Sequence, residues 1–207
     1  MLSIQSICIR VIAVILAMGI HESAHGLVSY WFGDPTAKEE GRLTLNPLAH
    51  VDWAGLLCLL VFRFGWAKPV PVDPRYYKDP KTGMIWTAFA GPIANFSLAL
   101  VSIILYYGCV KANVESTFVL SLLSSIAVLS IGFGVFNLLP IPPLDGSKIL
   151  FAFLPVDKYI RFTQGSNVMM IVFILLISSG ILDGPLMRMV SNSIDLFSHW
   201  AIVLWGL

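Results

Sequence analysis

Three ionisable residues lie together inside an apolar stretch near the N-terminus: His21, Glu22 and His25. Positions i and i+4 share one face of a helix, so both imidazoles can bind a single metal ion. Glu22 can then lie beside the open coordination position and take a proton from a water that zinc acidifies. The pattern is typical of a zinc metalloprotease. The alternative is a polar helix–helix contact, which is disfavoured because ionisable groups are costly within a bilayer.

A catalytic zinc usually has three protein ligands, so the histidine pair needs a third from elsewhere. Asp145 ends an uncharged run and follows three closely spaced prolines, Pro140, Pro142 and Pro143. Broken backbone at membrane depth is tolerated only where it is buried in protein or lines a wet cavity. We therefore prefer Asp145 as the third ligand, although an ordinary helix end at the interface would look the same. The remaining histidines and loop acids are weaker candidates: His199 is expected at the interface and the acids in solvent (Asp34, Glu39, Glu40 and Asp52).

Gly91 and Asn95 form a further polar feature within an apolar stretch. They are four residues apart and share a helix face, so Gly91 permits close helix approach while Asn95 offers an amide to the bundle. Asn137 is comparable. From these residues alone, a structural role is the simpler interpretation.

The composition indicates what kind of protein must position these residues. The chain has 207 residues, of which 57% are hydrophobic and only 12% charged, against about 25% charged in ordinary soluble domains. A soluble cytosolic enzyme and a disordered chain are both excluded. The net charge of +1 provides no basic surface for nucleic acid. We expect one membrane-embedded domain over residues 1–207; its three cysteines suggest no disulfide framework.

Four stretches are long and apolar enough to cross a bilayer: 2–33, 84–108, 116–144 and 162–182. The segment 53–62 is too short and is expected to be re-entrant, whereas 185–207 either spans or lies in the interface. Residues 1–20 resemble a signal peptide, but no small-residue cleavage site follows, which favours an uncleaved helix. We therefore expect an all-α polytopic membrane protein with four to five transmembrane helices. The alternation at 41–45 suggests a short membrane-associated strand or re-entrant region after the first helix.

The basic residues predict the orientation. Most of the 13 lysines and arginines fall in loops 34–83 and 145–161, which lie on one side if the helices alternate; the exceptions are Arg10, Lys111 and Arg188. By the positive-inside rule these loops are cytoplasmic and the N-terminus is extracytoplasmic.

With these residues placed, the chain resembles the site-2 protease family, zinc metalloproteases that cleave within the membrane. The resemblance rests on four motifs that extend across roughly residues 15–150, and it is closest to the short prokaryotic subgroup without a PDZ domain. The motifs are His21-Glu-Ser-Ala-His25; Gly33-Asp-Pro-Thr-Ala37 with Gly41-Arg-Leu-Thr-Leu-Asn-Pro-Leu48; Phe64-Gly-Trp-Ala-Lys-Pro-Val-Pro-Val72 leading to Gly91-Pro-Ile-Ala-Asn95; and Asn137 through Gly146. Trp53 departs from the family, which often has proline there.

The resemblance implies one zinc ion per chain, held by His21, His25 and Asp145, with Glu22 as general base. Asn95 would orient the substrate or stabilise the oxyanion. Substrates would be membrane proteins with a transmembrane helix, cleaved in a prokaryotic cytoplasmic membrane, and an extended substrate could pair with a strand edge in 34–53. The oligomeric state is not predicted. Two alternatives remain: a metal-binding transporter using the same His/Asp cluster, and a catalytically silent scaffold. Glu22 argues for the protease, since a transporter needs no general base.

Overall fold

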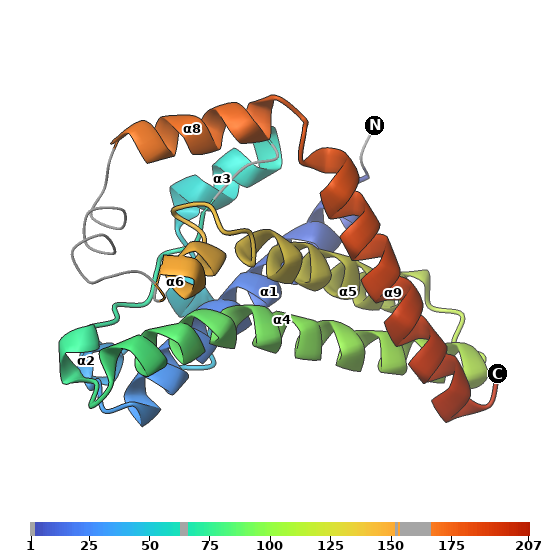
Figure 1. Cartoon of the computed structure of the whole chain (residues 1–207). Helices are drawn as coiled ribbons and strands as arrows, with labels where there is room; N and C mark the ends of the chain where they lie inside the picture. The colour runs from blue at the N-terminus through green and yellow to red at the C-terminus, as the bar shows by residue number, and fades with distance from the viewer. Residues whose placement is uncertain (1–2, 63–65, 152, 154–166) are drawn as a thin grey trace.

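The long helices of the chain form its central bundle. The computed structural model describes residues 3–62, 66–151, 153 and 167–207. Three helices there are long and apolar enough to cross a membrane: α1 (Ile4–Trp31), α4 (Pro80–Lys111) and α5 (Thr117–Asn137). They pack against one another, and α9 (Asp183–Trp205) leans on α4 and α5 (Figure 1). The all-α polytopic class predicted from the sequence is confirmed.

A fourth crossing depends on two helices taken together. Residues Ile171–Ser178 of α8 (Asn167–Ser178) and the whole of α9 are apolar enough jointly, but they meet at 75°. The described part of the chain therefore contains three spans, or four if this bent pair counts as one. Residues 162–166 of the helix expected over 162–182 lie outside the described residues, as do residues 152 and 154–161 of the loop expected over 145–161.

Local sequence explains where the long helices begin and end. The Asp79 side chain accepts hydrogen bonds from the N–H groups of Lys81 and Thr82, and Pro80 occupies the first helical position, so α4 begins four residues before its expected start at 84. In contrast, α5 ends at Asn137, before the expected 144, because the prolines that follow cannot continue a helix. The residues after it form turns that lead to α6 (Asp145–Phe151).

The expected strand or re-entrant region after the first helix is wrong. Short helices occupy much of this stretch: α2 (Thr36–Glu39), η1 (Pro47–His50), α3 (Trp53–Phe62) and η2 (Pro74–Tyr76). The extended pieces between them form no strand in the described residues. Their carbonyl groups bond to side chains instead: that of Thr44 accepts from Ser23 Oγ, and those of Lys68 and Pro69 accept from the Arg42 guanidinium, which also bonds the carbonyl of Ala49 in η1. No backbone ladder is needed to satisfy them.

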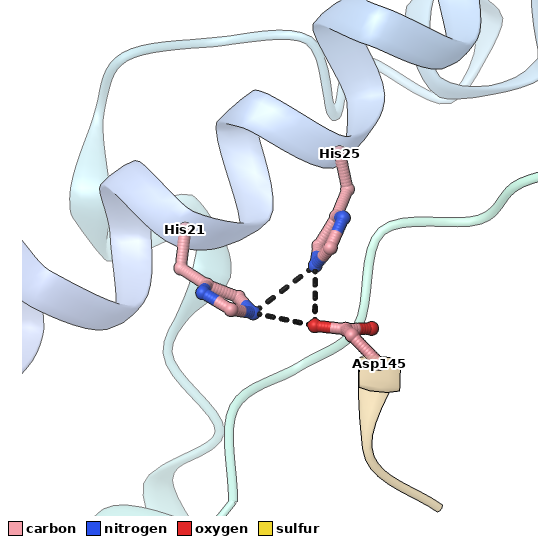
Figure 2. Close-up of side chains that lie close together, drawn as sticks. All are labelled: His21, His25 and Asp145. Atoms are coloured by element: carbon pink, nitrogen blue, oxygen red, sulfur yellow. Dashed lines mark hydrogen bonds and ion pairs between the residues drawn. The ribbon is translucent and has the colours of Figure 1, made fainter. Parts of the chain in front are cut away.

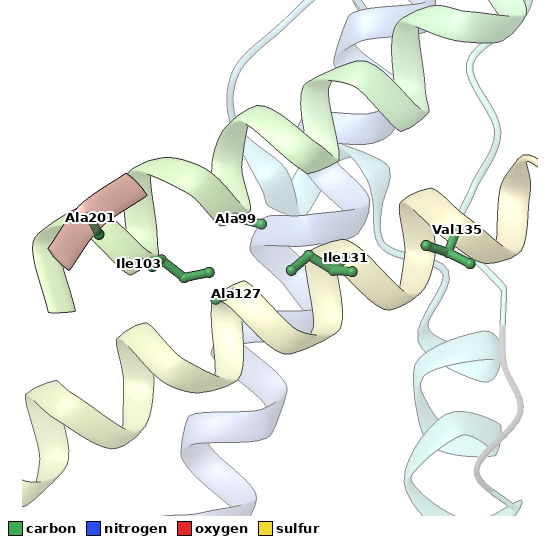
Figure 3. Close-up of a cluster of buried hydrophobic side chains, with 6 residues drawn as sticks. All are labelled: Ala99, Ile103, Ala127, Ile131, Val135 and Ala201. Carbon is green, nitrogen blue, oxygen red and sulfur yellow. The ribbon is translucent and has the colours of Figure 1, made fainter. Parts of the chain in front are cut away.

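Small side chains allow the central helices to approach closely. A cluster of buried residues fills the contact between α4, α5 and α9 (Figure 3): Ala99, Ile103, Ala127, Ile131, Val135 and Ala201. Large apolar side chains such as Val101 and Leu105 point outward and are about half exposed, as expected where helices face lipid. Association in lipid rests on such close packing rather than on burial from water.

Candidate metal centre

Three side chains converge where α1 meets the start of α6 (Figure 2). The Nε2 atom of His21 lies 3.0 Å from Nε2 of His25, and both lie 3.1 Å from Oδ2 of Asp145. All three residues are at most 7% exposed. The fold thus brings Asp145 to the two sequence-predicted histidine ligands, which precede it by 120 and 124 residues.

This arrangement fits a zinc ion. Each imidazole directs a nitrogen at one carboxylate oxygen, so three electron-rich atoms face a common centre. Ligands at the corners of a tetrahedron with zinc bonds of about 2.0–2.1 Å lie about 3.3 Å apart, close to the separations found here. Two histidines and one carboxylate are also a common ligand set of catalytic zinc sites, in which the fourth position stays open.

The turns between α5 and α6 position Asp145. A side chain at Gly146 would lie 2.1 Å from the carbonyl oxygen of Leu138, so only glycine lets the segment fold back so tightly onto the end of α5. Asp145 then begins α6, and its second oxygen, Oδ1, accepts an ion-paired hydrogen bond of 2.9 Å from Lys148. One carboxylate oxygen is therefore held by Lys148 while the other faces the histidines.

Helix α4 forms the wall behind both imidazoles. His25 Nδ1 donates to the carbonyl of Thr87 at 2.6 Å, which leaves Nε2 unprotonated in the neutral ring and available as a ligand. The Asn95 amide lies 3.1 Å from Nδ1 of His21. Between them, Gly91 lies so near that a Cβ there would be 2.5–2.6 Å from atoms of both rings.

Glu22 lines a cavity beside the three converging residues. The cavity measures about 370 Å³, and an extended stretch of chain after residue 66 forms part of its wall. Glu22 Oε2 accepts a hydrogen bond of 3.0 Å from the N–H of Val70 in this stretch. The described lining residues are His21, Glu22, His25, Pro69, Val70, Val72, Met84, Thr87, Ala88, Asn137, Pro143, Asp145 and Lys148. A carboxylate, the candidate ligands and a lysine thus share one polar space.

A buried hydrogen-bonded chain continues from α1 into the loops. Asp34 is fully buried, contrary to the expectation that it is solvated. Its Oδ2 accepts from Ser29 Oγ at 2.7 Å and from the N–H of Asp73 at 2.8 Å, and Ser29 contacts the Tyr77 hydroxyl, which reaches Thr87 Oγ1. Burial would raise the pKa of Asp34, but hydrogen bonds from Thr36, Asp73 and Ser29 hold the pKa below its usual value.

The other candidates from the sequence lie elsewhere. His50 is buried 3.1 Å from Ser23 Oγ, outside the converging group. His199 is exposed on α9, and Glu39 and Glu40 are exposed as expected. Asn137 lines the cavity and donates from its amide to the carbonyl of Phe133. Sequence reasoning missed the role of Val70 in contacting Glu22, since a backbone N–H has no residue signature.

Comparison with known proteins gives a consistent picture. Residues 106–179 match the model of peptidase family M50. "Putative zinc metalloprotease YwhC" of Bacillus subtilis is 40% identical over 171 residues, covering 80% of this chain and 78% of that protein. "Putative zinc metalloprotease Rip2" of Mycolicibacterium smegmatis is 30% identical over 140 residues, covering 64% of this chain and 52% of the relative. "Putative zinc metalloprotease SA1105" of Staphylococcus aureus is 34% identical over 106 residues, 44% of this chain and 25% of the relative. No solved structure matches significantly.

Proposed function

This chain belongs to peptidase family M50, the site-2 proteases, and on that premise we propose that it is an intramembrane zinc endopeptidase. It hydrolyses peptide bonds in or near the transmembrane segments of membrane proteins. The observation that carries the proposal is the convergence of His21, His25 and Asp145 beside Glu22 at a cavity among apolar helices. A single zinc ion per chain is proposed to bind there.

The depth of the site supports cleavage within the membrane. His21 and His25 lie ten and six residues before the end of α1 at Trp31, or about 9–15 Å along the helix axis at 1.5 Å per residue. The hydrocarbon core is about 30 Å thick. With the two basic loops in the cytoplasm and the N-terminus outside, the site lies below the cytoplasmic surface of a prokaryotic cytoplasmic membrane.

The proposed reaction assigns a role to each group. Zinc, when bound, polarises the scissile carbonyl and acidifies water. His21, His25 and Asp145 hold the metal, and Glu22 accepts the proton of the attacking water and delivers it to the leaving nitrogen. The substrate helix must unwind locally first, because its carbonyls are engaged in its own hydrogen bonds. The cavity receives this opened segment, with Lys148 and Glu22 on its walls.

The decisive experiment compares Glu22→Gln with the wild type in proteoliposomes that contain a single-span substrate. Glutamine keeps the size of the side chain but cannot accept the proton, so we expect zinc content to stay at one per chain and fragment release to stop. Glu40→Gln, at an exposed position in the adjoining loop, is the matched control and should cleave normally. Undiminished cleavage by Glu22→Gln would refute the proposal. A metal transporter, in contrast, would not need this carboxylate as a base.

A further inference from the structure

Asn95 lies behind His21, on the side of the ring that faces away from Asp145 and His25. It is fully buried, and its amide contacts the ring nitrogen of His21 that points away from Asp145. Asn95 is not among the described residues that line the cavity. Asn95 therefore does not line the cavity, whereas the family resemblance implies that it orients the substrate or stabilises the oxyanion.

We propose that Asn95 is a positioning residue that fixes the ring orientation and tautomer of His21, so that Nε2 stays available for the metal. The proposal rests on the proposed metal-dependent function. A histidine that binds a metal through Nε2 carries its proton on Nδ1, and this N–H needs a hydrogen-bond acceptor. The Asn95 amide is the group that contacts Nδ1 at 3.1 Å. The oxygen of this amide can accept a hydrogen bond from Nδ1–H.

An amide suits this position because it can serve both tautomers. In the structure the amide nitrogen faces His21 Nδ1, and Oδ1 is buried without a hydrogen-bond partner among the described residues. Oxygen and nitrogen of an amide are assigned from their surroundings, and half a turn of the group exchanges them. With Nε2 bound to a metal, Oδ1 accepts from Nδ1–H. With Nε2 protonated, the amide nitrogen donates instead.

The two histidines are thereby held from the same helix. Thr87, Gly91 and Asn95 follow one another at four-residue spacing and share a face of α4. The carbonyl of Thr87 fixes His25, the absent side chain of Gly91 makes room for both rings, and Asn95 fixes His21. The Gly91-x-x-x-Asn95 pattern in the sequence is explained by this wall.

The test is the zinc affinity of the purified full chain, measured by competition with a chromophoric chelator. Loss of such a supporting contact typically weakens metal binding about 10–100-fold, and we expect this in Asn95→Leu. Asn95→Asp retains an oxygen acceptor and should bind zinc close to the wild-type affinity. Ser102→Ala removes another buried polar group from α4, one that donates to the carbonyl of Leu98 in the preceding turn, and should bind zinc normally.

Thermal unfolding of the metal-free chains separates positioning from a general structural defect. We expect the metal-free form of Asn95→Asp to remain folded and its zinc binding to exceed that of Asn95→Leu. Equal affinities of the wild type and Asn95→Leu, or equal losses in the Asp and Leu variants, would overturn the inference. Failure of the proposed function has a different signature: wild type and His21→Ala would then bind zinc equally weakly.

Discussion

Substitution of Gly91 by alanine tests directly how closely α4 approaches the metal centre. An added Cβ would lie 2.5 Å from Cε1 of His21 and 2.6 Å from the Nε2 atoms of both His21 and His25. Comfortable contacts between carbon atoms are about 3.5–4.0 Å. The rings or the helix must therefore move by about 1 Å, and the two nitrogens are the atoms proposed to bind zinc.

The size of the effect follows from this overlap. Extra methyl groups forced into a packed interior typically cost about 1–3 kcal/mol. If the cost falls on the metal-bound form and not on the metal-free form, zinc affinity falls about 5- to 150-fold. The metal-free chain suffers less, because its rings need not converge on a metal ion and because alanine is favoured over glycine in a helix by up to about 1 kcal/mol.

The assay is again chelator competition, combined with fragment release from a single-span substrate at saturating zinc. Gly132→Ala is the matched control, since it introduces the same change in helix α5 at a position where the new Cβ meets no atom within 4 Å. We expect Gly132→Ala to behave as wild type or to be slightly more stable. Wild-type zinc affinity in Gly91→Ala would refute the close approach of α4 to the rings.

Three further predictions concern the loops and the topology. Asp34→Asn should lower the stability of the chain at neutral pH by about 1.5–3 kcal/mol, seen in thermal unfolding, whereas exposed Asp195→Asn should not. Because the folded-state pKa of Asp34 is depressed, its contribution is complete above about pH 4 and is lost as the pH falls through the depressed value; a pH-independent difference between wild type and variant would contradict this. Arg42→Lys keeps the charge but loses the forked guanidinium that donates to three backbone carbonyls, so thermal stability and cleavage should both fall. An unchanged melting temperature would show that these three hydrogen bonds do not stabilise the loop. In a cysteine-free background, Glu115→Cys should react with an impermeant maleimide in intact cells and Glu40→Cys only after permeabilisation; the reverse pattern would invert the proposed orientation.

Local patterns in the sequence singled out the residues that converge, and the family resemblance completed the set with Asp145. His21 and His25 are one helical turn apart, so any helix places them on one face. Asp145 follows a backbone break that prolines dictate. These are local rules, and the structure brings the three residues together as they predict.

The remaining features depend on contacts between distant segments. Asp34 is in a loop and looks solvated, but Ser29, Tyr77 and the backbone of Asp73 enclose it. The alternating residues at 41–45 suggest a strand, yet side chains of α1 and Arg42 satisfy the nearby carbonyls. No pattern within a single segment predicts which hydrogen-bond donors a neighbouring helix or loop supplies to it.

The separation of the ligands along the chain has a consequence for biogenesis. Asp145 is 120 residues beyond His25, and at about 5–20 residues per second it leaves the ribosome roughly 6–24 s later. During this interval the histidine pair and Glu22 are already synthesised, but the metal centre lacks its third ligand. On the proposed function, the complete set of three ligands exists only after Asp145 at the start of α6 has been made, and cleavage of neighbouring membrane proteins would begin only then.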